Sequence, residues 1–314
     1  MNLFNTVGTD VTTSPNPLMR AGLDWTVSKQ PIFTDNPRGG DPVSSSRHFA
    51  TVRSDNSNIL GIVGPDYQVV QNEELLYLCS RLATQGVEME TAGSLSGGAR
   101  TWIQLKGDSF GVGPNKDEVK TMTLFTNGHD GQWPLACLPT SIRVYCQNTL
   151  NLVMQAGHRS NMIITLRHTA NVNDRLEQMI FAVQNFKDRS TIFENQVHTL
   201  GSTTLGTRGI QEFWTNLYTS LFGDIYVNPT TEAEKDATTT ATSVLAKWAN
   251  TFDMEVKHSG PNLWTAMNAV TYWIDHQQIY RGEKKHENQF NDVLFGDGAK
   301  EKVKVMNAAL ALAY

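Results

Sequence analysis

The sequence has few cysteines and none in a pair spaced for a disulfide framework or a zinc site. Its three cysteines, Cys79, Cys137 and Cys146, form no CxxC motif, and an odd number without that motif is typical of reduced thiols in the cytosol. No apolar run approaches the roughly 18 residues that a membrane-spanning helix needs. The N-terminal residues also lack the basic-then-apolar pattern of a signal peptide. We therefore expect a cytoplasmic protein with no membrane partner.

An excess of positive charge is absent as well. The formal net charge is −5, which argues against a generally basic nucleic-acid-binding protein but allows local basic patches. The chain has 314 residues, of which 39% are hydrophobic, and it contains seven tryptophans. A chain of this length can bury a substantial core as one or two domains. The composition predicts an ordered globular protein.

A nucleotide-binding motif is missing, although one glycine-rich stretch resembles it superficially. The stretch is Gly93-Ser-Leu-Ser-Gly97-Gly98. A P-loop needs a lysine followed by serine or threonine after its last glycine, at the start of a helix. Here Ala99 and Arg100 follow and lead into a predicted strand. The pattern favours a hairpin turn over a phosphate site.

The spacing of apolar residues changes from strand-like in the first half to helix-like in the second. Predicted strands cover Leu23–Phe33, His48–Arg53, Ile59–Val63, Tyr67–Val70, Glu88–Ala92, Thr101–Lys106, Lys120–Thr126, Trp133–Leu138 and Met162–Arg167. Predicted helices cover residues 72–84 and 141–153, and Asn72 is the predicted N-cap of the first of them. A long helix is predicted to begin after Asn173 or Asp174. The remaining predicted helices are Ile210–Phe222, Glu232–Thr251, Leu263–Gln277 and Ala299–Ala313.

This order of elements predicts an α+β fold, in which an N-terminal antiparallel β-rich half packs against a C-terminal helical half. Residues 1–20 are polar and rich in proline, which predicts a flexible N-terminal arm. We expect residues 21–170 to form a β-rich α+β core. Residues 171–314 are expected to form a mainly helical region that packs on this core.

Polar residues concentrate between Leu124 and Leu150. At the centre of this segment His129, Asp130 and Gly131 form an HDG sequence that lies between two turn dipeptides, Asn-Gly and Asp-Gly. The strands predicted on either side make a hairpin connector the simplest interpretation. The HDG sequence nevertheless holds residue types that could take part in chemistry.

Metal and nucleophile chemistry are not supported by the spacing. The residues concerned are Cys137, Cys146, His158 and His168. They follow one another at intervals of about ten, whereas zinc ligands usually pair two to five residues apart. Cys146 with His129 or His168 would supply a nucleophile and a base. However, Cys146 lies on the apolar stripe of its predicted helix, where a free cysteine normally packs. We predict no catalytic residue, no metal and no cofactor.

A cluster of basic residues extends from Ser141 to Arg208, where acidic residues are fewer. Guanidinium groups on one face are what polyanion binding requires, and a helix start beside an arginine can receive an anion. The predicted nucleic-acid-binding residues are Arg143, Gln147, Asn148, Arg159, Arg167 and Arg175. The alternative is a solvated helix with local ion pairs.

Aromatic residues recur at helical spacing around Trp214 and Trp264. Such stripes form a core or a subunit interface far more often than a platform for base stacking. Their number predicts a homo-oligomer.

Six sequence blocks, in a fixed order, carry a resemblance to a known family. They are LGIVGPDYQVVQN at Leu60–Asn72, the glycine pair before Arg100-Thr-Trp102, HDG at His129–Gly131, RVYCQNTL at Arg143–Leu150, RHT at Arg167–Thr169 and LWTAMNAVTYWIDH at Leu263–His276. The fourth block fits the signature RVxCxNTL. With these blocks the chain, from about residue 20 to its end, resembles a family of phage- and plasmid-encoded proteins known only as a domain of unknown function.

The resemblance implies a mobile-element gene in a bacterial host cell and does not imply a reaction. The predicted layout is similar to that of single-strand annealing recombinases, in which a small curved antiparallel sheet packs on helices and subunits form rings with a basic groove. No motif is shared, and likeness of fold does not establish function. We predict a non-enzymatic protein of DNA metabolism that binds or anneals single-stranded DNA through a basic groove in an oligomer.

Two alternatives remain from other classes of protein. The first is a phage interaction protein or host-defence antagonist that binds a host protein and no nucleic acid. The second is a small metal-dependent hydrolase built around His129, Asp130 and His168.

Overall fold

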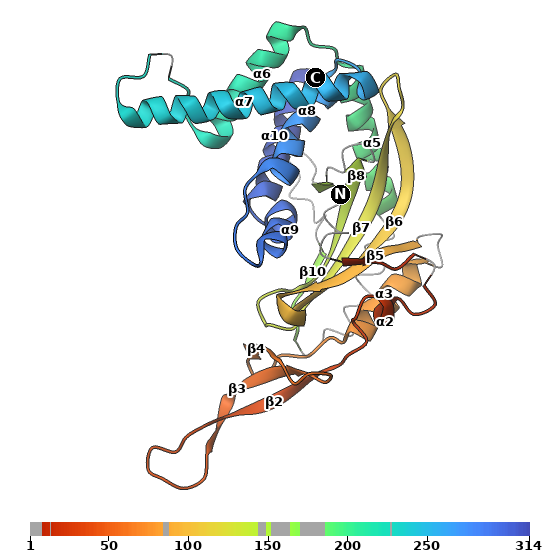
Figure 1. The fold of residues 1–314 in the computed structure, drawn as a ribbon. Coiled ribbons are helices and arrows are strands. Elements are labelled where there is room, and N and C mark those ends of the chain that lie inside the picture. The colour runs from red at the N-terminus through yellow and green to blue at the C-terminus, as the bar shows by residue number, and fades with distance from the viewer. Residues whose placement is uncertain are drawn as a thin grey trace. The chain divides into compact units, whose positions relative to one another are not determined.

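The structure, a computed structural model, describes residues 8–12, 14–83, 88–143, 149–151, 164–169, 186–226 and 228–314. It divides into two compact units. Unit 1 comprises residues 1–107, 122–140 and 161–187, and unit 2 comprises residues 108–121, 141–160 and 188–314. Antiparallel strands occupy mostly the N-terminal half and helices the C-terminal half (Figure 1). The predicted α+β class is confirmed.

Two antiparallel sheets are found within the described residues. The strands are β1 (Gly8–Asp10), β2 (Val27–Thr34), β3 (Val43–Arg53), β4 (Ile59–Val63), β5 (Glu88–Leu95), β6 (Arg100–Val112), β7 (Asp117–Gly128), β8 (Leu135–Arg143), β9 (Thr149–Asn151) and β10 (Ile164–Leu166). A seven-stranded sheet has the order β1-β5-β6-β7-β8-β10, with β9 paired to β8, and a three-stranded sheet has the order β2-β3-β4.

The helices of the described residues are α2 (Pro17–Arg20), α3 (Asn72–Ala83), α5 (Phe186–Ser202), α6 (Thr207–Phe222), α7 (Glu232–Ser259), α8 (Leu263–Tyr272), α9 (Lys285–Phe295) and α10 (Asp297–Ala313). They overlap the predicted ones at residues 72–84, 210–222, 232–251, 263–277 and 299–313, whereas α2 and α9 were not predicted. A π-helical turn, Trp273–Gln277, continues α8. The predicted start of the long helix at Asn173 or Asp174 lies outside the described residues. None of the helices in the described part of the chain is long and apolar enough to cross a membrane.

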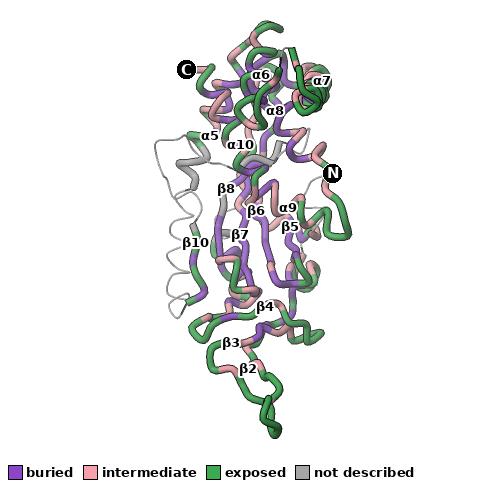
Figure 2. Tube along the Cα trace, turned by 90° about the vertical axis from the view of Figure 1, so that its left-hand side faces the viewer, coloured by how far each residue is buried: buried purple, intermediate pink, exposed green. Residues whose placement is uncertain are grey.

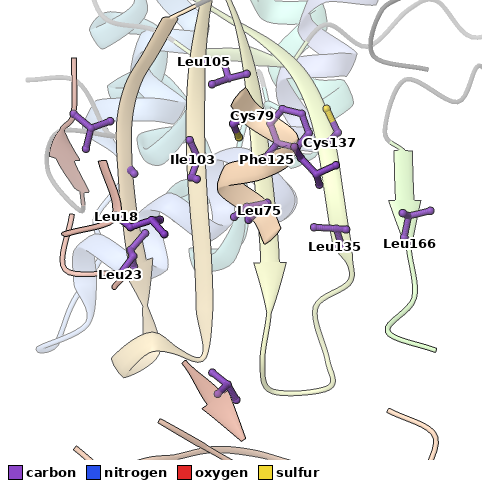
Figure 3. Close-up of a cluster of buried hydrophobic side chains, with 14 of the residues drawn as sticks. Leu18, Leu23, Leu75, Cys79, Ile103, Leu105, Phe125, Leu135, Cys137 and Leu166 are labelled. Atoms are coloured by element: carbon purple, nitrogen blue, oxygen red, sulfur yellow. The ribbon is translucent and has the colours of Figure 1, made fainter. Parts of the chain in front are cut away.

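The core of unit 1 lies between α3 and the seven-stranded sheet (Figure 3). Leu75, Leu78 and Cys79 recur at helical spacing on α3 and are fully buried. They meet side chains from the sheet, among which Phe125 and Cys137 are also buried. Burial raises the pKa of both the Cys79 and the Cys137 thiol, because the thiolate would lose its hydration. Both cysteines are free.

Residues 8–20, within the stretch that the sequence assigns to an arm, contribute to unit 1. Strand β1 pairs antiparallel with β5, with Gly8 opposite Gly93. Leu18 of α2 is buried in the core of the unit.

The core of unit 2 is built from apolar faces of its helices, with buried residues recurring at helical spacing on α6 and α7; Figure 2 shows buried and exposed positions together on the helices of this unit. The Trp214 indole donates a hydrogen bond of 3.0 Å to the carbonyl of Ala266. Trp264 is fully buried and donates to Asp117 at 2.9 Å. The aromatic residues around Trp214 and Trp264 therefore pack inside the unit.

Two predicted elements differ from the structure. Residues 67–70 do not form the predicted strand; the Gln68 amide donates to the carbonyl of His168 at 3.0 Å. The helix predicted from Ser141 is also wrong where it is described, since β8 extends to Arg143 and residues 149–151 form β9. Apolar residues four apart share one face of a strand as well as of a helix, and pairing in the sheet decides between them.

Candidate functional site

The predicted nucleic-acid-binding residues are only partly described. Gln147, Asn148, Arg159 and Arg175 lie outside the described residues. Arg143 is the last residue of β8 rather than part of a helix start. Arg167 is exposed and follows β10, whose Leu166 pairs with Leu135 at the beginning of β8. The pairing register therefore does not place the two arginines at one strand end.

His129, in contrast, is held by contacts on several sides within unit 1. Its amide donates to the carbonyl of Ala99 at 2.7 Å. Its carbonyl accepts a 2.6 Å hydrogen bond from the hydroxyl of Thr51 on β3. The edge of the Trp25 ring packs against the imidazole, with ring centroids 5.5 Å apart. The HDG turn thus joins the seven-stranded sheet to the three-stranded sheet.

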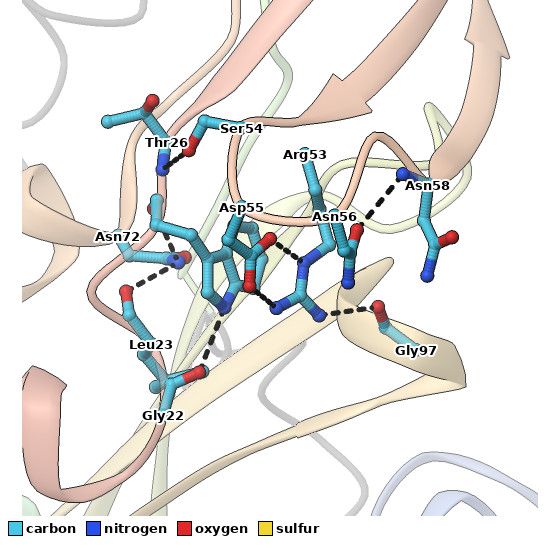
Figure 4. A network of polar contacts seen from close by, with 11 residues as sticks. Gly22, Leu23, Thr26, Arg53, Ser54, Asp55, Asn56, Asn58, Asn72 and Gly97 are labelled. Carbon is cyan, nitrogen blue, oxygen red and sulfur yellow. Dashed lines mark hydrogen bonds and ion pairs between the residues drawn. The ribbon is translucent and has the colours of Figure 1, made fainter.

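Asn72 fixes the tautomer of His129. The Asn72 amide nitrogen donates to the carbonyls of Leu23, at 3.0 Å, and Trp25, at 3.4 Å (Figure 4). Its oxygen must therefore face the Thr101 hydroxyl, at 3.1 Å, and the His129 Nε2 atom, at 3.2 Å. Because an amide oxygen only accepts hydrogen bonds, the imidazole carries its proton on Nε2.

The prediction that Asn72 caps the N-terminus of α3 is wrong. Its side chain lies in the interior, 2% exposed, and makes the contacts described above. The helix start is closed instead by the Glu74 carboxylate, which accepts a hydrogen bond of 2.6 Å from the amide of Gln71. This contact is one half of a capping box, since the Gln71 side chain bonds the backbone of Val27 instead of the helix start.

Both carboxylate oxygens of Asp130 are engaged. Oδ2 accepts from Arg100 Nε at 3.0 Å, and Oδ1 accepts from the amides of Gln132 and Trp133 at 2.8 and 3.1 Å. The Arg100 guanidinium also lies over the Trp133 ring, 4.5 Å from its centroid. These contacts tie the HDG turn to the start of β6. Gly131 completes the turn at a φ of +72°, a conformation that glycine adopts readily.

His168 lies beside the turn although it is distant in the sequence. Its ring stacks on the Tyr67 ring with centroids 5.0 Å apart and planes 11° apart. The Tyr67 hydroxyl donates a 2.6 Å hydrogen bond to the carbonyl of Gly128. The structure thus brings His129 and His168 into one buried region, as the hydrolase alternative requires.

Burial keeps both histidines neutral. It lowers the pKa of His129 to about 3, with a further decrease from the nearby His168 and an opposing effect of Asp130. Burial likewise lowers the pKa of His168 to about 4, against the opposing effects of the Gln68 backbone and Asp130. A general base works best with a pKa near the operating pH. Within the described residues, no group of three or more His, Cys, Asp or Glu side chains could hold a metal ion.

The glycine-rich stretch forms the predicted turn between β5 and β6 and has a structural task that the sequence did not reveal. The Arg53 guanidinium donates to the Gly97 carbonyl at 2.8 Å, pairs with both oxygens of Asp55 and lies 4.1 Å from the Trp25 ring centroid (Figure 4). Gly98 has a φ of +102°, and a Cβ there would meet Arg53 at 2.8 Å. The stretch therefore binds the side chain of Arg53, which belongs to β3.

A second polar cluster, in unit 2, also escaped sequence reasoning. Lys302 of α10 and Asp275 of the π-helical turn form an ion pair of 2.8 Å, with side chains only 2% and 1% exposed. Burial lowers the pKa of Lys302, and Asp275 opposes this decrease. The two residues are too far apart in the sequence for spacing to pair them. A buried pair of this kind fixes how α10 docks on the turn.

Comparison with protein-family models places the chain in a family. Residues 59–295 match the model described as Domain of unknown function (DUF932). This match covers most of the chain, and the chain belongs to the DUF932 family. Comparison with curated proteins and with solved structures gave no match.

Proposed function

We propose that this DUF932 protein is a non-enzymatic protein of DNA metabolism, encoded by a mobile element, that binds single-stranded DNA as an oligomer. One observation carries the proposal. Between Asp130 and Asp174 the chain has no acidic residue, and its only formally charged residues there are Arg143, Arg159 and Arg167. In a chain with a net charge of −5, such a stretch is a local excess of guanidinium groups. Guanidinium groups bind the phosphates of a nucleic-acid strand.

Two described features support a contact with phosphates near Arg167. Its side chain is exposed at the end of β10, which is the last strand of the seven-stranded sheet. A second cation, Lys29, donates to the carbonyls of Pro65 and Tyr67 at 2.6 and 3.1 Å. Since the Tyr67 ring stacks on His168, the neighbour of Arg167, Lys29 adds positive charge to the same part of unit 1.

In this proposal the HDG turn has no chemical role. His129 and Asp130 hold the two sheets of unit 1 together through the contacts described above. The charged side chains near Arg167 are then held on a rigid scaffold, which reduces the conformational entropy lost on binding.

Fluorescence anisotropy with a labelled single-stranded oligonucleotide tests the proposal. We expect binding at low salt that weakens as salt rises, because each phosphate contact releases about 0.7 counterion from a single strand. An Arg167→Ala variant should weaken binding and reduce the slope of log affinity against log salt by about 0.7. The matched control is Arg281→Ala, since Arg281 is exposed and lies outside the basic cluster.

Absence of binding at low salt by a nuclease-free sample contradicts the proposal, and so does an Arg167→Ala variant that binds like the wild type. Retention of a specific host protein by a sample that does not bind DNA would favour the interaction-protein alternative. Bound metal, with an activity lost in Asp130→Ala, would favour the hydrolase alternative.

A further inference from the structure

Unit 2 contains a cavity between α6 and α7, two helices that Figure 1 labels. Its volume is about 710 Å³, which lies within the range of about 300–1,000 Å³ that is usual for small-molecule sites. Residues of both helices line it, together with Leu205 before α6 and Pro261 after α7. All of these lining residues belong to unit 2. The size of the cavity suits a small molecule rather than a whole peptide helix.

The walls of the cavity are mostly apolar and partly aromatic. Ile210 and Trp214 come from α6, and Leu245 and Phe252 come from α7. The Trp214 and Phe252 rings meet edge to face, with centroids 5.6 Å apart and planes 82° apart. The Trp214 indole N–H already donates to the carbonyl of Ala266, so the indole can offer only its ring to the cavity. Such walls suit an apolar ligand body, and an aromatic body gains an additional ring contact.

The polar groups of the cavity are mostly hydrogen-bond acceptors. The Thr215 hydroxyl donates to the carbonyl of Gln211 at 2.9 Å, and the Thr242 hydroxyl donates to that of Thr238 at 2.8 Å. Because a hydroxyl has one hydrogen, both threonine oxygens can now only accept. The side chains of Thr207 and Gln211, which also line the cavity, can donate or accept. A ligand with N–H donors therefore finds more partners here than a ligand with acceptors alone.

Charge indicates the sign of the ligand. Asp253 carries the only formal charge among the described residues that line the cavity. It is exposed on α7, and within the described part of the chain its side chain forms no ion pair or hydrogen bond. The arginine of α6, Arg208, does not line the cavity and pairs with Glu212 at 2.8 Å. A carboxylate beside an apolar cavity favours a cation and disfavours an anion.

We propose that the cavity between α6 and α7 binds a small aromatic amine in its ammonium form. The aromatic body lies against the walls that Trp214 and Phe252 provide, and the ammonium group donates to the Asp253 carboxylate. A nucleotide is a poor ligand for this site, because its phosphates would meet Asp253 without a cation among the described lining residues. The proposal does not depend on nucleic-acid binding.

Isothermal titration calorimetry at low salt tests the site with three probes: phenylpropylammonium, phenylpropanol and phenylpropionate. They share one aromatic body, and their head groups are cationic, neutral and anionic. We expect the ammonium probe to bind with a Kd of about 1 mM or lower, which is an ordinary affinity for a ligand of about ten non-hydrogen atoms. It should bind about three to five times more tightly than the alcohol, as a partly exposed ion pair allows. The carboxylate probe should bind more weakly than the alcohol.

Two variants separate the charge from the space. Asp253→Asn keeps the shape of the side chain, so it should remove the preference for the ammonium probe and leave the affinity for the alcohol unchanged. Its matched control is Asp236→Asn, since Asp236 is exposed on α7, does not line the cavity and gives the same change of net charge. Ala246→Trp places a large side chain in the cavity wall and should abolish binding of both probes. The control for it is Thr240→Trp, at an exposed position of α7 outside the cavity.

Circular dichroism verifies that each variant stays folded. A wild type that does not bind the ammonium probe at about 10 mM overturns the proposal, as does equal binding of the three probes. A folded Asp253→Asn variant that keeps the preference overturns it too, and so does binding that survives Ala246→Trp. Arg167→Ala should bind the ammonium probe like the wild type, which separates this test from that of DNA binding.

Discussion

Asn72→Ala is expected to lower the free energy of unfolding of unit 1 by about 3–5 kcal/mol. The Asn72 side chain is 2% exposed and serves four groups: the carbonyls of Leu23 and Trp25, the Thr101 hydroxyl and the His129 imidazole. A net loss of about 1 kcal/mol for each of the three shorter hydrogen bonds, leaving out the 3.4 Å contact with the Trp25 carbonyl, gives the lower figure. Buried groups left without a partner, at about 1–3 kcal/mol each before relaxation, give the higher one.

Urea unfolding followed by tryptophan fluorescence measures this loss, since Trp25 packs against His129. Hydrogen exchange of peptides that cover β3, β4 and the HDG turn shows where the protein opens. Asn56→Ala is the control, because the Asn56 side chain is exposed and accepts one local hydrogen bond, from the Asn58 amide. We expect the control to lose less than about 0.5 kcal/mol.

A loss below about 1 kcal/mol for Asn72→Ala would refute the reasoning, because exposed asparagines also reach that value. Faster exchange confined to unit 2 would refute it as well. Either result would mean that the contacts of Asn72 do not hold unit 1 together.

Three further outcomes are expected. Gly61→Ala should destabilise unit 1 by about 2 kcal/mol or more in urea unfolding, because its Cβ would lie 2.5 Å from the backbone of the HDG turn. Acid should destabilise the protein, since the pKa values of His129 and His168, about 3 and about 4, lie below their unfolded values. The contribution of the two neutral histidines to the free energy of unfolding is complete above about pH 6.5. It decreases by about 1.4 kcal/mol per pH unit for each histidine as the pH falls towards the folded pKa values. In urea titrations at several pH values, the free energy of unfolding of His168→Gln should depend less steeply on pH than that of the wild type. Lys302→Met should cost about 3–5 kcal/mol by leaving the charge of Asp275 buried, and the double variant with Asp275→Leu should recover most of it; an equally unstable double variant would contradict this.

The order of the elements followed from the sequence because long periodic patterns record which face of an element is buried. The helices of unit 2 and the hairpin around HDG are examples. Asn72 shows the limit of such patterns. A polar residue before two glutamates is typical of a helix cap. The pattern does not show that the Asn72 side chain instead donates to the carbonyls of Leu23 and Trp25, which are distant in the sequence.

The candidate site was less accessible to sequence reasoning than the fold. His129, His168 and Tyr67 come from three distant stretches, and only tertiary packing stacks Tyr67 on His168. The residue types suggested chemistry, whereas the sequence does not show that burial lowers the pKa of both histidines. The segment from Ser141 was predicted wrongly because an apolar spacing of four fits a strand and a helix equally well.

The way in which unit 1 is assembled affects how the chain can be synthesised and divided. Its core joins Leu18 near the N-terminus to Phe125 and to Leu166, and the chain contributes residues 108–121 to unit 2 in between. A growing chain cannot complete this core until Leu166 has left the ribosome. Any fragment that ends before Leu166 lacks a side chain of this core. For expression and for genetic dissection, the first half of this chain is not a separable module.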